Sequence, residues 1–258
     1  METPAQPSRY GEPWTREELI LAFDLYCRIP FQKTKTSNPE VQKLAALLSR
    51  SPASIARKLG NFGAFDPVLR SAEIRGLVHT STLDREIWDQ FHDDWSALVW
   101  QASKLRRSFE EQRGGIPVRC RPAGPSETLR MTKQRAHQAF FREAILSSYD
   151  ETCCVTGLRI RECLIASHIV PWSADEEHRA DPTNGLCLSS TFDRLFDAGL
   201  VTISDDLSVC ISGRLLQTKV PSTQELICTY HGKPMIRPKR FMPSAERLRW
   251  HHSNVFKG

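Results

Sequence analysis

The stretch from residue 166 to residue 199 constrains the fold of this chain more than any other. Its front, residues 163–170, is small, apolar and β-branched up to Pro171, a pattern that is typical of a β-strand. A polar loop over residues 172–183 follows. Residues 186–188 then predict a short strand that returns beside the first.

A helix is expected directly after the return strand. Ser189, Ser190 and Thr191 are all candidates for its N-cap, and Gly199 is a typical helix stop. Strand, loop, strand and helix together predict a ββα unit.

Four side chains of this unit can carry chemistry. Asp193 and Asp197 are four residues apart, so both carboxylates lie on one face of the predicted helix. Such a pair can hold a hard divalent cation such as Mg²⁺ through oxygen. His168, on the facing strand, can take a proton from water. Asn184 lies in the loop between the two strands.

Each of these features alone has a more ordinary explanation. A single histidine before an apolar residue is most often structural, and Asn-Gly is most often a turn. An aspartate pair at helical spacing is most often solvated or paired with a neighbour such as Arg194. The order and spacing of all four residues together are what is specific.

The chain resembles the HNH, or ββα-metal, nuclease family in the variant found in restriction-type endonucleases. The resemblance covers roughly residues 132–256. It is carried by Cys154–Gly157, Ala166–Ile169 with Pro171 and Trp172, Arg179 with Asp181 and Pro182, Asn184–Leu186, Asp193–Asp197, and Trp250 and His251 with Val255 and Phe256.

The resemblance implies a role for each residue. His168 would be the general base, and Asn184 would pin the loop and orient that histidine. Asp193 and Asp197 would hold one divalent cation per site, Mg²⁺ or Mn²⁺, at positions where many relatives carry histidine. The implied reaction is hydrolysis of a DNA phosphodiester to a 5′-phosphate and a 3′-hydroxyl.

Two departures from the family pattern matter. Many relatives have another metal ligand immediately before the base, where this chain has Ser167. Many also have two CxxC zinc knuckles, whereas Cys154 is followed by Gly157, and Cys187 has no CxxC partner. No structural zinc is therefore expected.

Composition places the chain among ordinary globular proteins. It has 40% hydrophobic and 25% charged residues, and no apolar run is long enough to suggest a membrane segment. Eight cysteines at irregular spacing indicate reduced thiols and a cytoplasmic location rather than a disulfide framework. Residues 1–13, polar and proline-containing, are expected to be a flexible leader.

Residues 14–98 predict a helical domain of helix-turn-helix or winged-helix type. Thr15 with Glu18, Asn38 before Pro39, and Ser51 before Pro52 each predict a helix start. The third helix is expected to expose Arg57, Lys58 and Asn61 to DNA. A plain three-helix bundle with solvated basic residues is the alternative, since acidic and basic residues nearly balance here. A last helix is expected over residues 84–95.

The rest of the chain is expected to be a basic linker and the nuclease domain. The linker would cover residues 99–131, charged and helical at first and then rich in Gly and Pro. Residues 132–258 would be the nuclease domain, which opens with a helix over 132–149. Arg179 is expected to hold a flanking phosphate. His251 and the basic run 237–240 are expected beside the DNA backbone, unless the tail is a basic segment without an ordered role.

The sequence thus predicts an α+β protein that cuts double-stranded DNA and is related to restriction and defence. A requirement for modified bases is left open. Because one ββα unit cuts one strand, a double-strand break would need two copies, which suggests a homodimer. Two alternatives stay open. One is a DNA-binding regulatory protein with an inactive ββα unit, and the other is a structure-specific or RNA-cutting nuclease.

Overall fold

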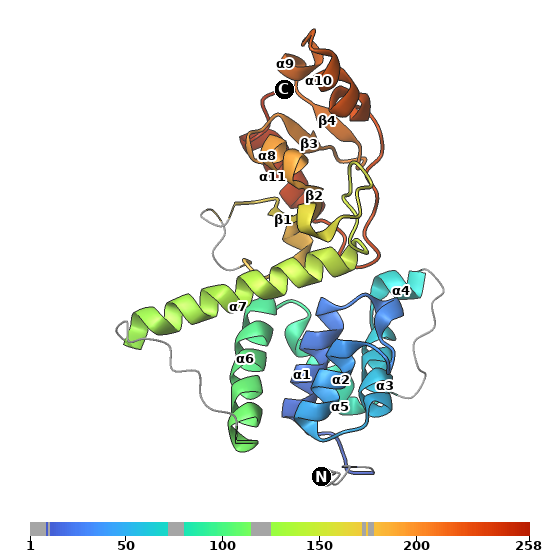
Figure 1. The fold of residues 1–258 in the computed structure, drawn as a ribbon, viewed down its shortest axis with the longest axis vertical. Coiled ribbons are helices and arrows are strands. Elements are labelled where there is room, and N and C mark those ends of the chain that lie inside the picture. Colours follow the sequence, from blue (N-terminus) through green and yellow to red (C-terminus); the bar gives the residue numbers. More distant parts are fainter. Residues whose placement is uncertain (1–8, 10, 72–79, 115–124, 172–173, 175–177) are drawn as a thin grey trace, which may run out of the picture. The chain divides into compact units, whose positions relative to one another are not determined.

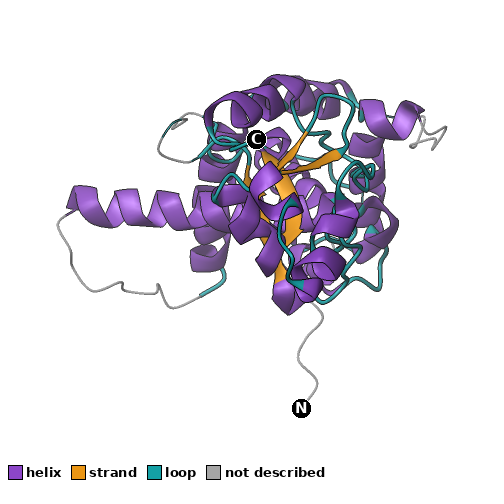
Figure 2. Cartoon of the chain, turned by 90° about the horizontal axis from the view of Figure 1, so that it is seen from above, coloured by secondary structure: helices purple, strands orange, loops and turns teal. Residues whose placement is uncertain are grey.

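The computed structural model describes residues 9, 11–71, 80–114, 125–171, 174 and 178–258, with the backbone alone at Ser71 and at 125–130 (Figure 1). Two compact units make up the chain, Met1–Glu143 and Ala144–Gly258. Helices predominate, and the described strands form two two-stranded sheets (Figure 2). The predicted α+β class is confirmed. Most of the expected leader, the Gly/Pro-rich part of the linker, and Trp172 lie outside the described residues.

The first unit is built from helices whose starts match the cap signals of the sequence. Thr15 and Glu18 form a capping box at the start of α1, and Asn38 and Ser51 cap α2 and α3 with their side chains. The helices of this unit are α1 Arg16–Arg28, η1 Phe31–Lys33, α2 Pro39–Leu48, α3 Pro52–Gly63, α4 Pro67–Ser71, α5 Thr82–Phe91, α6 Trp95–Gln112 and the first part of α7, Pro125–Ser148.

Helix α1 lies at the centre of this unit. Every residue from Glu18 to Cys27 is buried, and α1 packs against α2, α3, α5 and α6. Aromatic side chains fill the core around Phe23, whose ring centroid lies 5.0 Å from that of Phe62 and 5.4 Å from that of Trp88. Large aromatic side chains in contact contribute much of the apolar burial that stabilises a bundle of this size.

The end of the first unit differs from the prediction. The expected single helix over 84–95 is two helices, because α5 ends at Phe91 and Asp94 caps a new helix through the N–H of Ala97 at 2.9 Å. This helix, α6, continues to Gln112 and buries Ala102. The first part of the expected linker, residues 99–131, is therefore packed helix, and α7 begins before that linker was expected to end.

The predicted pair of helices with a tight turn is present. Ser49, between α2 and α3, takes a left-handed conformation with φ 54°, which reverses the chain sharply. No strand occurs among the described residues of the first unit, so the winged-helix form is not confirmed. Its role in reading DNA stays a prediction.

The second unit is organised around the ββα unit that the sequence predicted. Strands β1, Leu164–His168, and β2, Gly185–Ser189, are antiparallel, with Leu164 opposite Ser189 and His168 opposite Gly185. Helix α8, Ser190–Asp197, follows β2 directly and packs against both strands. The remaining elements are η2 Arg161–Cys163, η3 Pro182–Asn184, β3 Val201–Ile203, β4 Val209–Ile211, α9 Gly213–Leu216, α10 Pro221–Leu226, η4 Cys228–Tyr230 and α11 Ala245–Asn254.

Helix α7 enters the second unit with its apolar face inward, as expected for the helix predicted over residues 132–149. Ala144 and Ile145 of this part, and Tyr149 just after the helix, are at most 3% exposed, whereas Phe140 is buried in the first unit. All described cysteines are free thiols. Among the described residues, no helix is long and apolar enough to cross a membrane.

Candidate active site

The ββα unit brings the predicted histidine and the predicted aspartates onto neighbouring elements. His168 ends β1, and α8 packs against that strand. Phe192 and Phe196 bury the apolar side of α8 at 2% and 1% exposure. As a consequence Asp193 is half-buried and Asp197 is exposed on the remaining surface of the helix.

One ring nitrogen of His168 is fixed by a backbone carbonyl. Its Nε2 lies 3.2 Å from the carbonyl oxygen of Arg179. Because a carbonyl oxygen can only accept, Nε2 must carry the proton, and in the neutral ring Nδ1 is then the basic nitrogen. Burial lowers the pKa of His168, the bond to the carbonyl raises it in part, and the positive charge of Arg247 lowers it again. The net lowering keeps the imidazole neutral at neutral pH.

Asn184 ties the end of β1 to the chain that precedes β2. Its side-chain oxygen accepts the N–H of Val170 at 2.9 Å, and its amide nitrogen donates to the carbonyl of Val170 at 3.1 Å. Its own carbonyl accepts the N–H of Ile169 at 2.9 Å. Asn184 is 1% exposed, so these bonds are shielded from water. This geometry suits the loop-pinning role that the sequence suggested.

The two carboxylates of α8 suit a hard cation. Partial desolvation raises the pKa of Asp197, the charge of Asp193 raises it further, and Arg194 lowers it in part. Two anionic groups that disfavour each other's charge are a donor set that a divalent cation would stabilise. Within the described part of the chain, no group of three or more His, Cys, Asp or Glu side chains could hold a metal.

Ser167 does not replace the ligand that many relatives have at this position. Its side chain is 3% exposed, and its hydroxyl has no hydrogen-bond partner among the described residues. It faces Leu186 across the β-ladder. A hydroxyl buried in this way is not available to a cation at the surface of α8.

The turn at residues 153–157 supports the start of α8. Gly157 has φ 75°, and its N–H donates to the carbonyl of Cys153. The sulfur of Cys153 accepts the N–H of Ser189, the N-cap residue of α8, at 3.2 Å. Cys154 donates its N–H to the carbonyl of Cys187 in β2 at 2.7 Å. The cysteine motif thus anchors a turn to β2 and to the helix start.

A network that the sequence did not predict supports the loop before Asn184. Asp181 caps the 3₁₀ turn η3 by accepting the N–H and the hydroxyl of Thr183, both at 2.8 Å. Arg247 in α11 donates to Asp181 at 2.6 Å and to Thr183 at 2.8 Å. Only the Asp181-Pro182 pair was visible in sequence, because the partner arginine is on a distant helix.

His251, which was expected beside the DNA backbone, is buried in the structure. It is 2% exposed and stacks on Phe196 with ring centroids 3.7 Å apart. Its Nε2 donates to the carbonyl of Phe196 at 3.2 Å, and its Nδ1 accepts from the hydroxyl of Thr202 at 2.9 Å. Burial lowers the pKa of His251 to about 4, so the ring is neutral. Its position makes it a support for the last turn of α8.

The basic run 237–240 is only partly available to DNA. Arg237 and Lys239 are exposed, but Arg240 is 1% exposed and donates to the hydroxyl of Ser147 in α7 at 2.8 Å. The side chain of Arg179, expected on a flanking phosphate, is half-buried. Its structural contribution to the site is the carbonyl that contacts His168.

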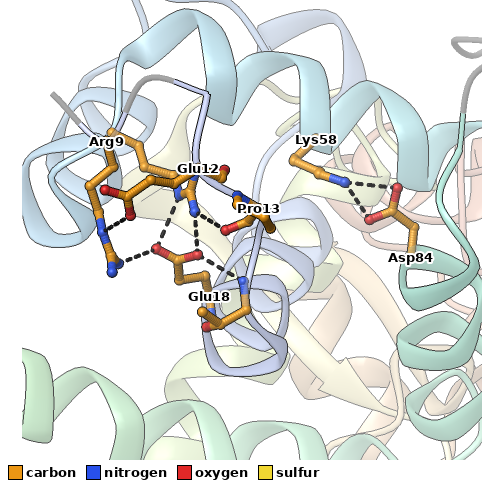
Figure 3. Close-up of polar contacts among 8 residues, drawn as sticks. Arg9, Glu12, Pro13, Glu18, Lys58 and Asp84 are labelled. Carbon is orange, nitrogen blue, oxygen red and sulfur yellow. Dashed lines mark hydrogen bonds and ion pairs between the residues drawn. The ribbon is translucent and has the colours of Figure 1, made fainter.

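Two of the three DNA-contacting residues predicted on α3 face another helix instead. Lys58 pairs with Asp84 at 2.7 Å (Figure 3). Asn61 donates to the same carboxylate at 2.9 Å. Asp84 has no exposed side-chain surface, and its carboxylate also accepts the N–H of Ser81 in the capping box of α5. Lys58 and Asn61 therefore join α3 to α5. Arg57 is exposed, as predicted.

Figure 3 also shows Glu18, near the start of α1, at the centre of a group of polar contacts. Arg50 donates to both carboxylate oxygens of Glu18, at 3.0 and 2.7 Å, and to the carbonyls of Glu12 and Pro13. Both side chains are at most 3% exposed. This arginine stands in the tight turn between α2 and α3, so it fixes the turn to the start of α1.

Comparison with known proteins identifies the second unit's central segment. The model of a family described as HNH endonuclease matches residues 153–204. No curated protein matches the chain. A solved structure described as "Modification dependent TagI restriction endonuclease" is similar at 21% identity, over 45% of this chain and 38% of that one, with a TM-score of 0.33. The chain thus spans less than half the length of that neighbour.

The matched segment contains all four residues that the sequence singled out, His168, Asn184, Asp193 and Asp197, on the strand, the loop and the helix described above. Residues 153–204, with the ββα unit that they form, belong to the HNH endonuclease family.

Proposed function

We propose that this chain is a metal-dependent DNA endonuclease of the HNH type, with His168 as its general base. The observation that supports this most is the bond from Nε2 of His168 to the carbonyl of Arg179. It selects the tautomer in which Nδ1 is basic, and burial keeps the ring neutral. A base that is neutral and oriented before substrate arrives is what hydrolysis at neutral pH needs.

In the proposed reaction, a water oxygen attacks the phosphorus of a phosphodiester while Nδ1 of His168 takes one proton from that water. The bond between phosphorus and the 3′ oxygen breaks. The products are a 5′-phosphate and a 3′-hydroxyl, the latter protonated from solvent. Asn184 keeps the end of β1 in place through its two bonds to Val170 during this step.

Asp193 and Asp197 would hold one divalent cation, Mg²⁺ or Mn²⁺. Both offer hard anionic oxygens on one face of α8. Desolvation, and then the charge of Asp193, raises the pKa of Asp197, and a bound cation would favour the charged form. When bound there, the cation would stabilise the negative charge that develops on the phosphate and the leaving oxygen. Water would supply the remaining ligands.

The proposed substrate is double-stranded DNA, in the setting of restriction and defence, with modified bases as a feature that directs cleavage. This part of the proposal comes from the family of the matched segment and from the presence of a helical unit earlier in the same chain. The first unit would contribute to site choice through exposed basic residues such as Arg57. Because each ββα unit contains one base, a double-strand break would need two copies of the chain as a homodimer.

The test is a cleavage assay with the full chain. Supercoiled plasmid, the same plasmid carrying phage-type modified cytosines, and a structured RNA are each incubated with Mg²⁺, with Mn²⁺ or with EDTA. Nicking of plasmid in either metal, its loss in EDTA, and 5′-phosphate ends are the expected results. Cleavage of RNA alone would replace DNA with RNA as the substrate. No cleavage of any nucleic acid in either metal would contradict the proposal.

A further inference from the structure

Arg247 stands out because it connects the C-terminal helix to the turn that precedes Asn184. The residue lies in the first turns of α11, after the N-cap Ser244. Its guanidinium is 2.6 Å from the Asp181 carboxylate, and the two side chains are 15% and 12% exposed. Charge-assisted bonds of this length between shielded partners are strong enough to fix a loop.

The contacts of Arg247 are completed by Thr183. The hydroxyl of Thr183 donates its one proton to Asp181 and accepts a bond from Arg247, so it links the two charged side chains. A backbone bond from the N–H of Ser244 to the carbonyl of Thr183, 2.9 Å long, runs beside it. Helix α11 is therefore joined to η3 by both side chains and backbone.

The turn that Arg247 holds contacts the histidine from two directions. On one side the carbonyl of Arg179, two residues before Asp181, receives the proton of His168 Nε2. On the other side Asn184 follows Thr183 directly and binds both backbone groups of Val170, two residues after His168. Displacement of η3 would therefore shift the orienting carbonyl and the end of β1 together.

We propose that Arg247 is a positioning residue of the nuclease site, which holds through Asp181 and Thr183 the turn that orients His168. This inference rests on the proposed function. Arg247 acts through its neighbours and is not assigned any contact with DNA. Removal of a group that supports a catalytic residue typically costs about 10-fold to 100-fold in activity.

The experiment compares Arg247→Ala, Arg247→Lys and Asp181→Asn with Arg249→Ala in the full chain. Arg249 is the matched control, since it lies on the same helix with 59% of its side chain exposed. We expect Arg247→Ala to lower the single-turnover cleavage rate about 10-fold to 100-fold, with half-saturation by DNA changed less than about 2-fold. Arg247→Lys should recover part of the rate, and Arg249→Ala should match the wild type.

A double-mutant cycle shows whether the two residues act as one unit. The variant that combines Arg247→Ala with Asp181→Asn should be no slower than the worse single variant, because both changes break the same link. Fully multiplicative losses would contradict the proposal, and so would a folded Arg247→Ala protein that cleaves within about 2-fold of wild type. If Arg247→Ala does not fold, Arg247→Lys and Asp181→Asn decide the same question.

A second measurement separates this inference from the proposed function. Nitrogen-15 NMR of the metal-free protein reports which ring nitrogen of His168 carries the proton, with His168→Gln used for assignment. The wild type should show the Nε2–H tautomer, and Arg247→Ala should show a mixture of tautomers. An unchanged Nε2–H signal would overturn the positioning role even if no nucleic acid is cleaved. A changed signal in a chain that cuts nothing would contradict the function alone.

Discussion

The carboxylates of α8 differ from the buried carboxylates of the first unit in how the surrounding protein treats their charge. In the first unit, Glu18 and Asp84 have no exposed side-chain surface, and each is paired with a shielded cation, Arg50 or Lys58. In the second unit, Asp181 is paired in the same way with Arg247, and the imidazoles near the active site are neutral. Its two carboxylates on α8 remain at the surface and make no ion pair within the described part of the chain.

The pKa values show the same contrast. Burial on its own would raise the pKa of Asp84, but its bonds to Lys58, Ser81 and Asn61 lower the pKa overall. Desolvation and Asp193 instead raise the pKa of Asp197. A carboxylate stabilised by its own protein holds helices together, whereas one that is destabilised is available to a ligand. We infer that the first unit is a rigid scaffold and that the second contains the reactive site.

The strongest test of this contrast changes the histidine of the second unit. His168→Ala should lower the rate of DNA cleavage by about 10² to 10⁴-fold, because the reaction loses its general base. Melting temperature and DNA binding should stay close to those of the wild type. Single-turnover cleavage gives the rate, and His252→Ala, an exposed histidine on α11, is the matched control. A His168→Ala protein with more than about a tenth of the wild-type rate would remove His168 from this role.

A second prediction concerns pH and the buried imidazole of His251. Its pKa is about 4 in the folded protein and 6.5 for an ordinary histidine, so the unfolded chain binds the proton more tightly. The stability from this group is complete above pH 6.5 and is lost as pH falls toward 4. The difference corresponds to roughly 3 kcal/mol at about 1.4 kcal/mol per pH unit.

The measurement for His251 is the free energy of unfolding of the second unit as a function of pH. His251→Phe should be less stable than wild type at pH 7, yet should lose less stability between pH 6.5 and 4. Equal pH dependence in the two proteins would show that His251 is not held neutral by its contacts with Phe196 and Thr202.

In the first unit, the loss of an ion pair should lower the free energy of unfolding without changing the rate of DNA cleavage. Lys58→Met removes the cation beside Asp84, while the bonds from Asn61 and Ser81 remain. We expect a loss of about 1 to 3 kcal/mol in the free energy of unfolding, measured by urea denaturation. The cleavage rate at saturating DNA should not change. A Lys58→Met protein of unaltered stability and weaker DNA binding would instead restore Lys58 as a DNA contact.

The smallest effect is expected at Arg57, on the exposed side of the same helix. Arg57→Ala should change stability by less than about 0.5 kcal/mol, as is usual for surface positions. If α3 contacts DNA, one phosphate contact is lost. The slope of the logarithm of the binding constant against the logarithm of salt concentration should then become shallower by about one. Fluorescence anisotropy at several salt concentrations measures this slope. An unchanged slope would leave α3 outside the interface.

Local signals in the sequence were sufficient to predict the ββα unit and the starts of α1, α2 and α3. Ser189 before Phe192, Thr15 with Glu18, and Asn38 before Pro39 act within one turn of chain, where caps and periodicity determine the structure. The split between α5 and α6 was missed, because the apolar spacing continues across the short break before Trp95.

Lys58, Asn61 and His251 are less exposed than expected for one physical reason. Helical periodicity tells which residues share a face, but not which distant residue that face meets. Lys58 meets Asp84, and His251 meets Thr202, through contacts that exist only after the chain has folded. The network of Arg247 with Asp181 was invisible for the same reason. The sequence therefore suggested contacts with DNA for polar residues that the fold uses to hold its own elements together.

The central claim is that α8 holds a cation while the paired carboxylates of the first unit do not. Its most direct test is the increase in melting temperature of the second unit when Mn²⁺ is added to the full chain without DNA. Free Mn²⁺ at about 100 times its dissociation constant should raise the free energy of unfolding of the wild type by about 2.7 kcal/mol. The account predicts that this increase is lost when Asp193→Asn and Asp197→Asn are combined, and is fully kept in Asp84→Asn, which is less stable throughout. A full Mn²⁺-dependent increase in the Asp193→Asn, Asp197→Asn protein would contradict it.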